Sequence, residues 1–187
     1  MRFALLVFLT ASSVAAYDSG VSYTGVKLGL IGSGSVNNDD DSDHQQVGPS
    51  AGLFFDLPLG SRLHYGLATD LHKMSWRGER LDYRIDETGW LLDIGVNLKA
   101  DFFGDDSSLG IRPGIGVGVG FLEKMDGLGV SGSSYVILRG TTELVYFTPG
   151  DLMFVLEGGV WYAPSGGDNV TDVSIGPLVL LRAGVMF

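Results

Sequence analysis

The sequence predicts an all-β protein, an eight-stranded antiparallel up-and-down transmembrane β-barrel. Three observations carry this prediction: apolar and polar residues alternate along eight segments, the connections between the segments are short and long in turn, and aromatic residues gather near segment ends. The chain has 187 residues, a size that suits one domain. Its net charge of -10 argues against a nucleic-acid-binding protein, and the absence of cysteine excludes disulfides and thiolate sites.

The first sixteen residues have the pattern of a secretory signal peptide. Arg2 supplies the positive charge, residues 3–9 an apolar core and residues 14–16 a small-residue cleavage site. The apolar core is too short for a spanning helix, which needs about 20 apolar residues. We therefore expect a signal peptide over 1–16 and a single barrel domain over 17–187, with residues 17–22 as a short periplasmic lead.

Eight segments of the remaining chain alternate with a period of two, as strands with one apolar face do. Their apolar faces run over residues 24–30, 51–57, 63–71, 90–102, 109–121, 136–146, 152–162 and 173–187. Each segment is near or above the ~9–11 residues that a tilted strand needs to cross a bilayer.

The connections between these segments are of two kinds that alternate strictly. Residues 58–61, 103–108 and 148–151 form short turns. The longer and more polar connections are 33–46, 75–88, 122–134 and 163–172. Short turns at one end and long loops at the other describe an outer-membrane barrel, whose turns are periplasmic and whose loops are extracellular.

Aromatic residues are predicted to form two belts, one at each membrane interface. The outer belt would hold Trp76, Trp90, Phe121, Tyr135 and Tyr162, and the inner belt Phe55, Phe102, Tyr146 and Phe187. A soluble lipocalin-like barrel would explain the alternation equally well. It would not explain aromatic residues gathered at strand ends or charged residues in mid-strand.

The C-terminal segment is the most specific element of the sequence. It runs Val179-Leu180-Leu181-Arg182-Ala183-Gly184-Val185-Met186-Phe187, an alternating strand that ends in an aromatic residue. With it, residues 17–187 resemble the small Gram-negative outer-membrane β-barrels of the OmpA/OmpX/OmpW-like superfamily. The resemblance implies that the barrel-assembly machinery reads Leu181, Ala183, Val185 and Phe187 as a signal. It also implies a monomer in the bacterial outer membrane, in contact with lipid and lipopolysaccharide.

The face opposite the apolar one carries the charged residues and is expected to line the lumen. These residues are Lys27, Arg62, His64, Asp70, His72, Asp93, Lys99, Asp101, Arg112, Arg139, Glu143, Glu157 and Arg182. An isolated buried charge is very costly, so opposite charges should pair. Two interpretations stay open: a closed interior held by ion pairs, or a narrow pore beside inward-facing glycines at 110, 114, 116, 118 and 120.

Several motifs that could indicate chemistry are weak here. Asp70 and His72 share one face about 7 Å apart along the strand, which suits a catalytic pair or a metal site, but ordinary packing in the lumen is the simpler interpretation. His64 lies roughly 27 Å from His72 by strand rise and cannot share a metal with it. The acidic run 37–43 lacks the glycine and distal glutamate of an EF-hand loop. The GxGxxG match at 127–132 lies in no βαβ unit, so no nucleotide site is expected.

Contacts with lipid are suggested at the outer rim. Lys73, Arg77 and Arg80 suit lipopolysaccharide phosphates. Some eight-stranded barrels edit lipid A, and the deacylases among them use a His and a Ser near the C-terminus on the membrane face. No His follows His72 in this chain, and only His44 keeps that option open. The palmitoyltransferases carry an N-terminal amphipathic helix, for which residues 17–24 are too short and too polar.

The sequence thus predicts an integral membrane protein without catalytic residues, metal or cofactor. Its predicted role is structural, adhesive or another surface interaction through the outer loops, because loops on a rigid scaffold commonly carry binding residues. One alternative is a narrow channel for ions or small hydrophobic compounds. A weaker alternative is a lipid A-modifying enzyme.

Overall fold

The computed structural model describes residues 20–32, 34–38, 41–80, 83–103, 108–124, 133–149, 152–167 and 173–187. The predicted signal peptide over 1–16 and the glycine motif over 127–132 lie outside these residues. The side chains of 35–44 and 78–87, which include those of His44 and Arg80, lie outside the described part as well.

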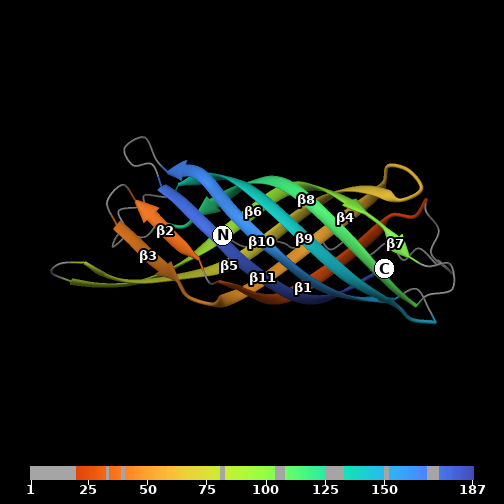
Figure 1. Cartoon of the computed structure of the whole chain (residues 1–187), viewed down its shortest axis with the longest axis horizontal. Helices are drawn as coiled ribbons and strands as arrows, with labels where there is room; N and C mark the ends of the chain where they lie inside the picture. The colour runs from red at the N-terminus through yellow and green to blue at the C-terminus, as the bar shows by residue number, and fades with distance from the viewer. Residues whose placement is uncertain are drawn as a thin grey trace, which may run out of the picture.

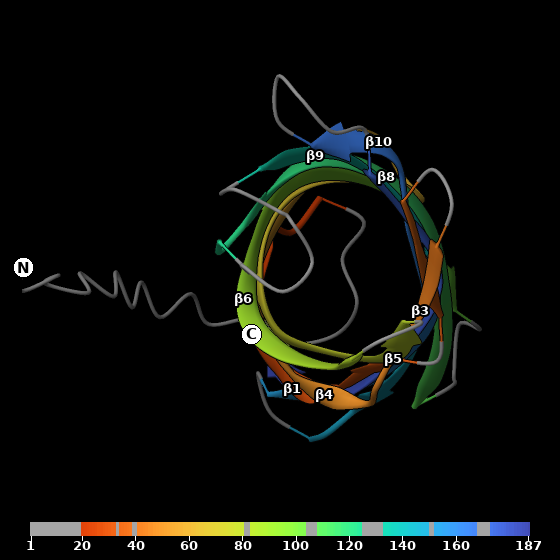
Figure 2. The same ribbon diagram turned by 90° about the vertical axis from the view of Figure 1, so that its left-hand side faces the viewer.

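Eight long strands form a closed antiparallel barrel, which confirms the predicted fold class (Figures 1 and 2). They are β1 (Tyr23–Gly32), β4 (Gly48–Pro58), β5 (Leu63–Arg80), β6 (Tyr83–Ala100), β8 (Leu109–Leu122), β9 (Ser134–Phe147), β10 (Met153–Gly167) and β11 (Val173–Met186). Each strand pairs with the next one in this order, and β1 pairs with β11. This last pairing closes the ring and leaves no sheet edge within the membrane, which lipid requires.

Three further strands are short. The hairpin of β2 (Ser35–Asn38) and β3 (Asp41–Gln45) lies where the sequence predicted a loop over 33–46. It pairs with β11 on one side and with β5 on the other, so it extends the wall at one end of the barrel. We call this the outer end, and the end with the short turns and the C-terminus the inner end. The two-residue β7 (Phe102–Phe103) pairs with β8 there.

The predicted loop over 75–88 is wrong, because β5 and β6 continue through it as a paired hairpin. Their register runs from Leu63 opposite Ala100 to Arg80 opposite Tyr83. In Figure 1 this yellow-green hairpin projects beyond the other strands on the left. Outside the membrane a hairpin needs its backbone hydrogen bonds but no apolar face, so the alternation ends before the strands do. The predicted loop over 163–172 is shortened for the same reason, since β10 continues to residue 167.

The outer wall of the barrel is apolar. Side chains that point away from the lumen are exposed, among them Leu28 at 66%, Ile115 at 68% and Leu67 at 60%. Charged side chains of the same strands are buried inside. This inverted surface excludes the soluble lipocalin-like alternative, because a continuous apolar wall of this extent would aggregate in water. No helix long and apolar enough to cross a membrane occurs among the residues that the structure describes.

One irregularity changes which way a side chain points. The pairing of β10 with β11 shifts between Trp161, opposite Leu178, and Ala163, opposite Ile175. An extra residue on β11 at this point reverses the alternation beyond it. Ile175, predicted on the outer face, is therefore fully buried in the lumen.

Candidate functional site in the barrel lumen

Side chains fill the lumen in three layers. At the outer end lies an apolar layer formed by Ile31, Met74, Trp76, Leu91, Leu122, Tyr135, Ile137, Trp161, Ala163, Ile175, Leu178 and Leu180. At the inner end lies a second apolar layer formed by Tyr23, Phe54, Ala68, Val145, Met153, Val155 and Met186, with Val21, Phe103 and Phe147 packed against it. Between the two layers lies a network of charged side chains, which we call the ion network.

The structure buries twelve of the thirteen residues that the sequence predicted in the lumen. The exception is Arg62, which is exposed in the turn before β5. The sequence placed Arg62 on the same face as His64, two residues later. This orientation was wrong because side chains in a turn do not alternate between two faces as they do in a strand. One member of the network was missing from the predicted set. This residue is Asp56, which is fully buried. It lies on the same face of β4 as Ser50, so the alternation along this strand could have predicted its position in the lumen.

Glu143 lies at the centre of the inner half of the ion network. It accepts hydrogen bonds from Lys27, from Lys99 at 2.9 Å and from Arg112 at 3.1 Å. Lys99 also contacts Asp56 at 2.8 Å. These side chains come from β1, β4, β6, β8 and β9, so the cluster ties distant parts of the wall together.

Arg112 makes three ion pairs in this half, as many as Glu143. Besides Glu143, its guanidinium reaches Asp101 at 2.8 Å and Asp56 at 3.1 Å. Its charge also lies 5.1 Å from the centre of the Tyr23 ring, within the range of a cation–π contact. Planar guanidinium groups suit such multiple contacts, because they offer five donors in a fixed geometry.

The outer half of the ion network is built around two arginines. Arg139 reaches Asp70 at 2.7 Å and Asp93 at 3.0 Å. Arg182 contacts Asp70 and reaches Glu157 at 2.6 Å. The two halves are joined because Lys27 contacts both Glu143 and Glu157.

Every charge of the ion network has an opposite charge beside it. The cationic members are Lys27, Lys99, Arg112, Arg139 and Arg182, and the anionic members are Asp56, Asp70, Asp93, Asp101, Glu143 and Glu157. Carboxylates outnumber cationic side chains by one. His64 lies beside this set, with its Nδ1 3.0 Å from Asp101.

The inward-facing glycines of β8 make room for neighbouring side chains. A Cβ added at residue 116 would lie 2.9 Å from Cγ of Arg139, and one at residue 118 would lie 3.0 Å from its guanidinium. The same test at 114 and 120 meets Lys99 at 3.0 Å and Ile137 at 2.6 Å. The groove that the sequence allowed as a pore is thus occupied. A cavity of about 10 Å³ between Lys27, Asp70 and Arg139 has room for about one water molecule.

Several solved structures share this architecture. Neisserial surface protein A (NspA) matches with a TM-score of 0.61 and 16% identity, over 88% of this chain and 95% of that one. The outer membrane protein OprG of Pseudomonas aeruginosa matches with a TM-score of 0.58 and 15% identity, over 91% of this chain and 99% of that one. A major outer membrane protein of Thermus thermophilus matches at 0.52 and 13% identity, over 89% and 99%. No protein-family model and no curated protein matches the chain.

In this chain the shared barrel fold is combined with an apolar outer wall and a charged interior. The chain is a membrane-spanning β-barrel with the fold of outer-membrane proteins. At such low sequence identity the solved structures support the fold and do not determine the specific role of this chain.

The aromatic belts of this barrel differ in part from the prediction. Trp90, Phe121, Tyr162, Phe55, Phe102 and Tyr146 are exposed on the outer wall, and Phe187 is half-buried. Trp76 and Tyr135 are only 1% exposed and point into the lumen, so their assignment to the outer belt is wrong. Their parity shows why: Trp76 shares a face with His72 four residues earlier, and Tyr135 shares one with Arg139.

The C-terminal strand lies at the seam that closes the barrel. Leu181 and Ala183 are exposed on the wall, while Val185 and Phe187 are half-buried. The backbone of Phe187 exchanges two hydrogen bonds of 2.9 Å with Thr24. Recognition of these residues by an assembly machinery remains a prediction.

Two of the three predicted rim residues, Lys73 and Arg77, lie toward the base of the projecting hairpin, and the backbone of the third, Arg80, lies opposite Tyr83 at its tip. Lys73 is partly exposed, and Arg77 is exposed on β5, where its backbone pairs with that of residue 44. Asp70 and His72, which the sequence placed on one face, are both buried, and β6 brings Asp93 opposite Asp70.

Proposed function

We propose that this protein is a non-conducting outer-membrane barrel that acts through its outer surface, in a structural, adhesive or other surface-interaction role. The observation that carries this proposal is the filled lumen. Two apolar layers and a paired ion network occupy the interior at three successive levels. A barrel of this size is ordinarily filled by side chains, and this one follows that rule.

A channel for ions needs a continuous hydrated path, and the interior argues against one. Among the described residues the central cavity has room for about one water molecule. Opening a path would require breaking ion pairs such as Arg139–Asp93, which costs several kcal/mol once one partner is left unpaired in a buried site (~3–5 kcal/mol). The ion network therefore supports a structural role for the interior.

The outer end supports a role in contacts with other molecules. The β2–β3 and β5–β6 hairpins extend the wall beyond the eight-stranded part and are braced against each other by the pairing of β3 with β5 (Figure 1). A hairpin on a rigid barrel presents its side chains at low conformational cost, as binding loops on scaffolds do. Lys73 and Arg77 at its base suit the phosphates of lipopolysaccharide, which we propose as the neighbouring lipid.

We also propose that the barrel has no enzymatic activity. A lipid-modifying enzyme needs its reactive groups at the membrane face or rim. The described histidines, His64 and His72, are fully buried in the lumen instead. Barrel assembly by the cellular machinery and a monomeric state complete the proposal.

One observation favours a second candidate, the passage of a small apolar compound through the wall. A concavity of about 570 Å³ lies over β5, β6, β8 and β9, lined by Tyr65, Val96, Leu98, Ile115, Val117 and Leu138 together with Asn97, Gly116 and Arg139. Its lining is almost wholly apolar, which suits a hydrophobic guest. Behind the concavity, on the lumen side of the wall, the side chain of Arg139 occupies the path that the compound would take. This candidate therefore ranks second.

The test compares bacteria that carry the native barrel with bacteria that carry a barrel with both outer hairpins cut back to short turns. Adhesion to protein-coated and bare surfaces and survival in detergent are measured, with folding checked by the heat-dependent shift in gel mobility. A matched control replaces the turn over 58–61 at the inner end. Loss of adhesion or detergent resistance in the hairpin variant alone supports the proposal. Unchanged behaviour of a folded hairpin variant contradicts it.

A further inference from the structure

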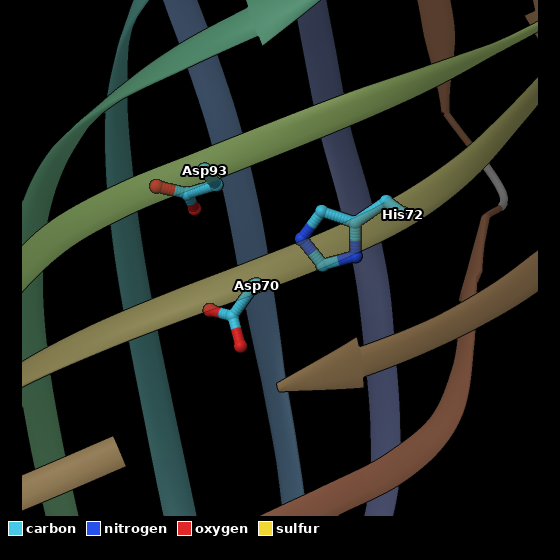
Figure 3. Close-up of side chains that lie close together, drawn as sticks. All are labelled: Asp70, His72 and Asp93. Atoms are coloured by element: carbon cyan, nitrogen blue, oxygen red, sulfur yellow. The ribbon is translucent and has the colours of Figure 1, made fainter. Parts of the chain in front are cut away.

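Three side chains of metal-binding type converge in the outer half of the ion network (Figure 3). Asp70 and His72 lie on β5, and Asp93 lies on β6 directly opposite Asp70. One nitrogen or oxygen atom from each lies within 4.8 Å of the others, and all three residues are buried. Two carboxylates and an imidazole are a donor set that suits a divalent transition metal such as zinc.

His72 is the group that points to a ligand. It is fully buried, and neither its Nδ1 nor its Nε2 has a hydrogen-bond partner. Its ring lies beside the two carboxylates in Figure 3, and it also packs against the Trp161 ring at an angle of 70°, with the ring centres 6.2 Å apart. A buried polar group without a partner is costly and rare in folded proteins, so it calls for an explanation. An unshared imidazole nitrogen is among the commonest metal ligands in proteins.

We propose that Asp70, His72 and Asp93 bind one divalent transition-metal ion, with zinc as the best fit to the donors. Zinc bonds to nitrogen and oxygen are about 2.0–2.2 Å long, which puts tetrahedral ligand atoms roughly 3.4 Å apart. The present separations are larger by at most about 1.4 Å, which side-chain rotation can close. A water molecule would be the fourth ligand, as at zinc sites with three protein ligands.

The hydrogen bonds around the two carboxylates suit such a site. Trp161 donates from Nε1 to Asp93 at 3.1 Å, and Arg139 donates to both carboxylates. A carboxylate has about four acceptor positions, so these donors and Arg182 leave lone pairs free on Asp70 and Asp93. Metal-binding carboxylates are commonly held by such outer hydrogen bonds.

The charges of the surrounding network also permit a cation. Six carboxylates face five cationic side chains, so Arg139 and Arg182 are more than offset and the network carries one surplus negative charge. A divalent ion would offset this surplus and leave one positive charge on the network. It would also bind one of the two unpartnered nitrogens of His72, neither of which takes part in the ion pairs.

The position of the site determines how the ion enters. The outer apolar layer, with Trp76 and Leu178 among its fully buried members, lies between the site and the outer end. A bound ion would therefore exchange slowly with solvent, and uptake would occur while the barrel folds. The proposal goes beyond the surface role above and does not depend on it, because the site lies inside the barrel.

The experiment refolds residues 17–187 without an affinity tag in detergent, with equimolar Zn²⁺ or without metal, followed by dialysis against a chelator. Metal content per folded chain is measured by mass spectrometry, and folding by the heat-dependent gel shift. We expect about one zinc per chain, and at least a roughly tenfold loss of retained metal in His72→Asn and in Asp93→Asn. Refolding with Co²⁺ gives an independent readout, since a four-coordinate site with a nitrogen ligand produces visible absorption bands.

A matched control replaces the histidine of the β2–β3 hairpin, His44→Ala, and is expected to retain as much metal as the native chain. A native barrel that folds and retains no zinc overturns the proposal. Equal retention by His72→Asn also overturns it, as does loss of the metal in His44→Ala alone. Because His72→Asn keeps a neutral polar side chain, although a smaller one, and leaves every ion pair in place, a folded variant is expected.

Discussion

Removal of Arg112 tests whether the ion network holds the barrel together. The side chain is fully buried on β8 and donates to Asp101 at 2.8 Å, Glu143 at 3.1 Å and Asp56 at 3.1 Å. In Arg112→Met the volume and the apolar stem are kept, while the charge and its donors are lost. Removing one partner of a buried ion pair ordinarily costs about 3–5 kcal/mol.

The neighbouring contacts place the expected cost at the lower end of this range. Asp56 keeps Lys99, and Glu143 keeps Lys27 and Lys99, so Asp101 alone loses its main cationic partner. We therefore expect a loss of about 3 kcal/mol in the free energy of unfolding, roughly a hundredfold in the folding equilibrium constant.

The assay is equilibrium unfolding by guanidinium in lipid vesicles, followed by tryptophan fluorescence. Arg62→Met is the matched control, because this arginine is exposed in a turn, and its effect is expected within about 0.5 kcal/mol. An Arg112→Met barrel as stable as the control, to within about 1 kcal/mol, would refute the reasoning that the paired interior stabilises the fold.

Three further predictions concern the wall and the packing of the lumen. Ile115→Arg places a charge near the middle of the apolar wall and should lower the free energy of unfolding in vesicles by about 2–4 kcal/mol. Leu59→Arg in the inner turn is the control and should lower it little. Equal effects of the two variants would contradict a membrane-facing wall. Gly116→Val, whose Cβ would clash with Oδ1 of Asn97 and lie 2.9 Å from the backbone oxygen of Val96, should lower stability by about 1–3 kcal/mol in the same assay. Gly140→Val, with open space around its Cβ, should not, and similar losses would show that the lumen is not tightly packed. Brominated lipids should quench Trp90 and spare the two inward-facing tryptophans, so that Trp90→Phe abolishes the quenching; residual quenching would place another tryptophan on the wall.

Strand parity was enough to predict the wall and the interior at most positions. Arg139, Glu143 and Arg182 alternate with apolar residues that need lipid, so a period of two fixes which face is inside. The same parity would have placed Trp76 and Tyr135 in the lumen. Their assignment to the belt rested on their nearness to a segment end, which says nothing about the face of the strand.

Other features depend on information that alternation lacks. The bulge that turns Ile175 inward is set by local backbone pairing between β10 and β11, and the pattern continues past it without a visible break. The hairpin over 75–88 remains a strand outside the membrane, where no apolar face is required.

The candidate metal site shows the same limit. Asp70 and His72 are neighbours along one strand, so the sequence could pair them. Asp93 joins them only because the register of β5 and β6 sets it opposite Asp70, and because Arg139 reaches across from β9 to both carboxylates. Register between strands and the reach of long side chains depend on the closed barrel and are not written in either segment alone.

The central claim is that the lumen is closed, and single-channel recording tests it most directly. Residues 17–187 are refolded, folding is verified by the heat-dependent gel shift, and the protein is inserted into a planar bilayer under an applied voltage. The filled interior predicts no conductance steps above the bare bilayer. Steady, reproducible steps from folded protein would contradict the account, since they require a hydrated path through the ion network.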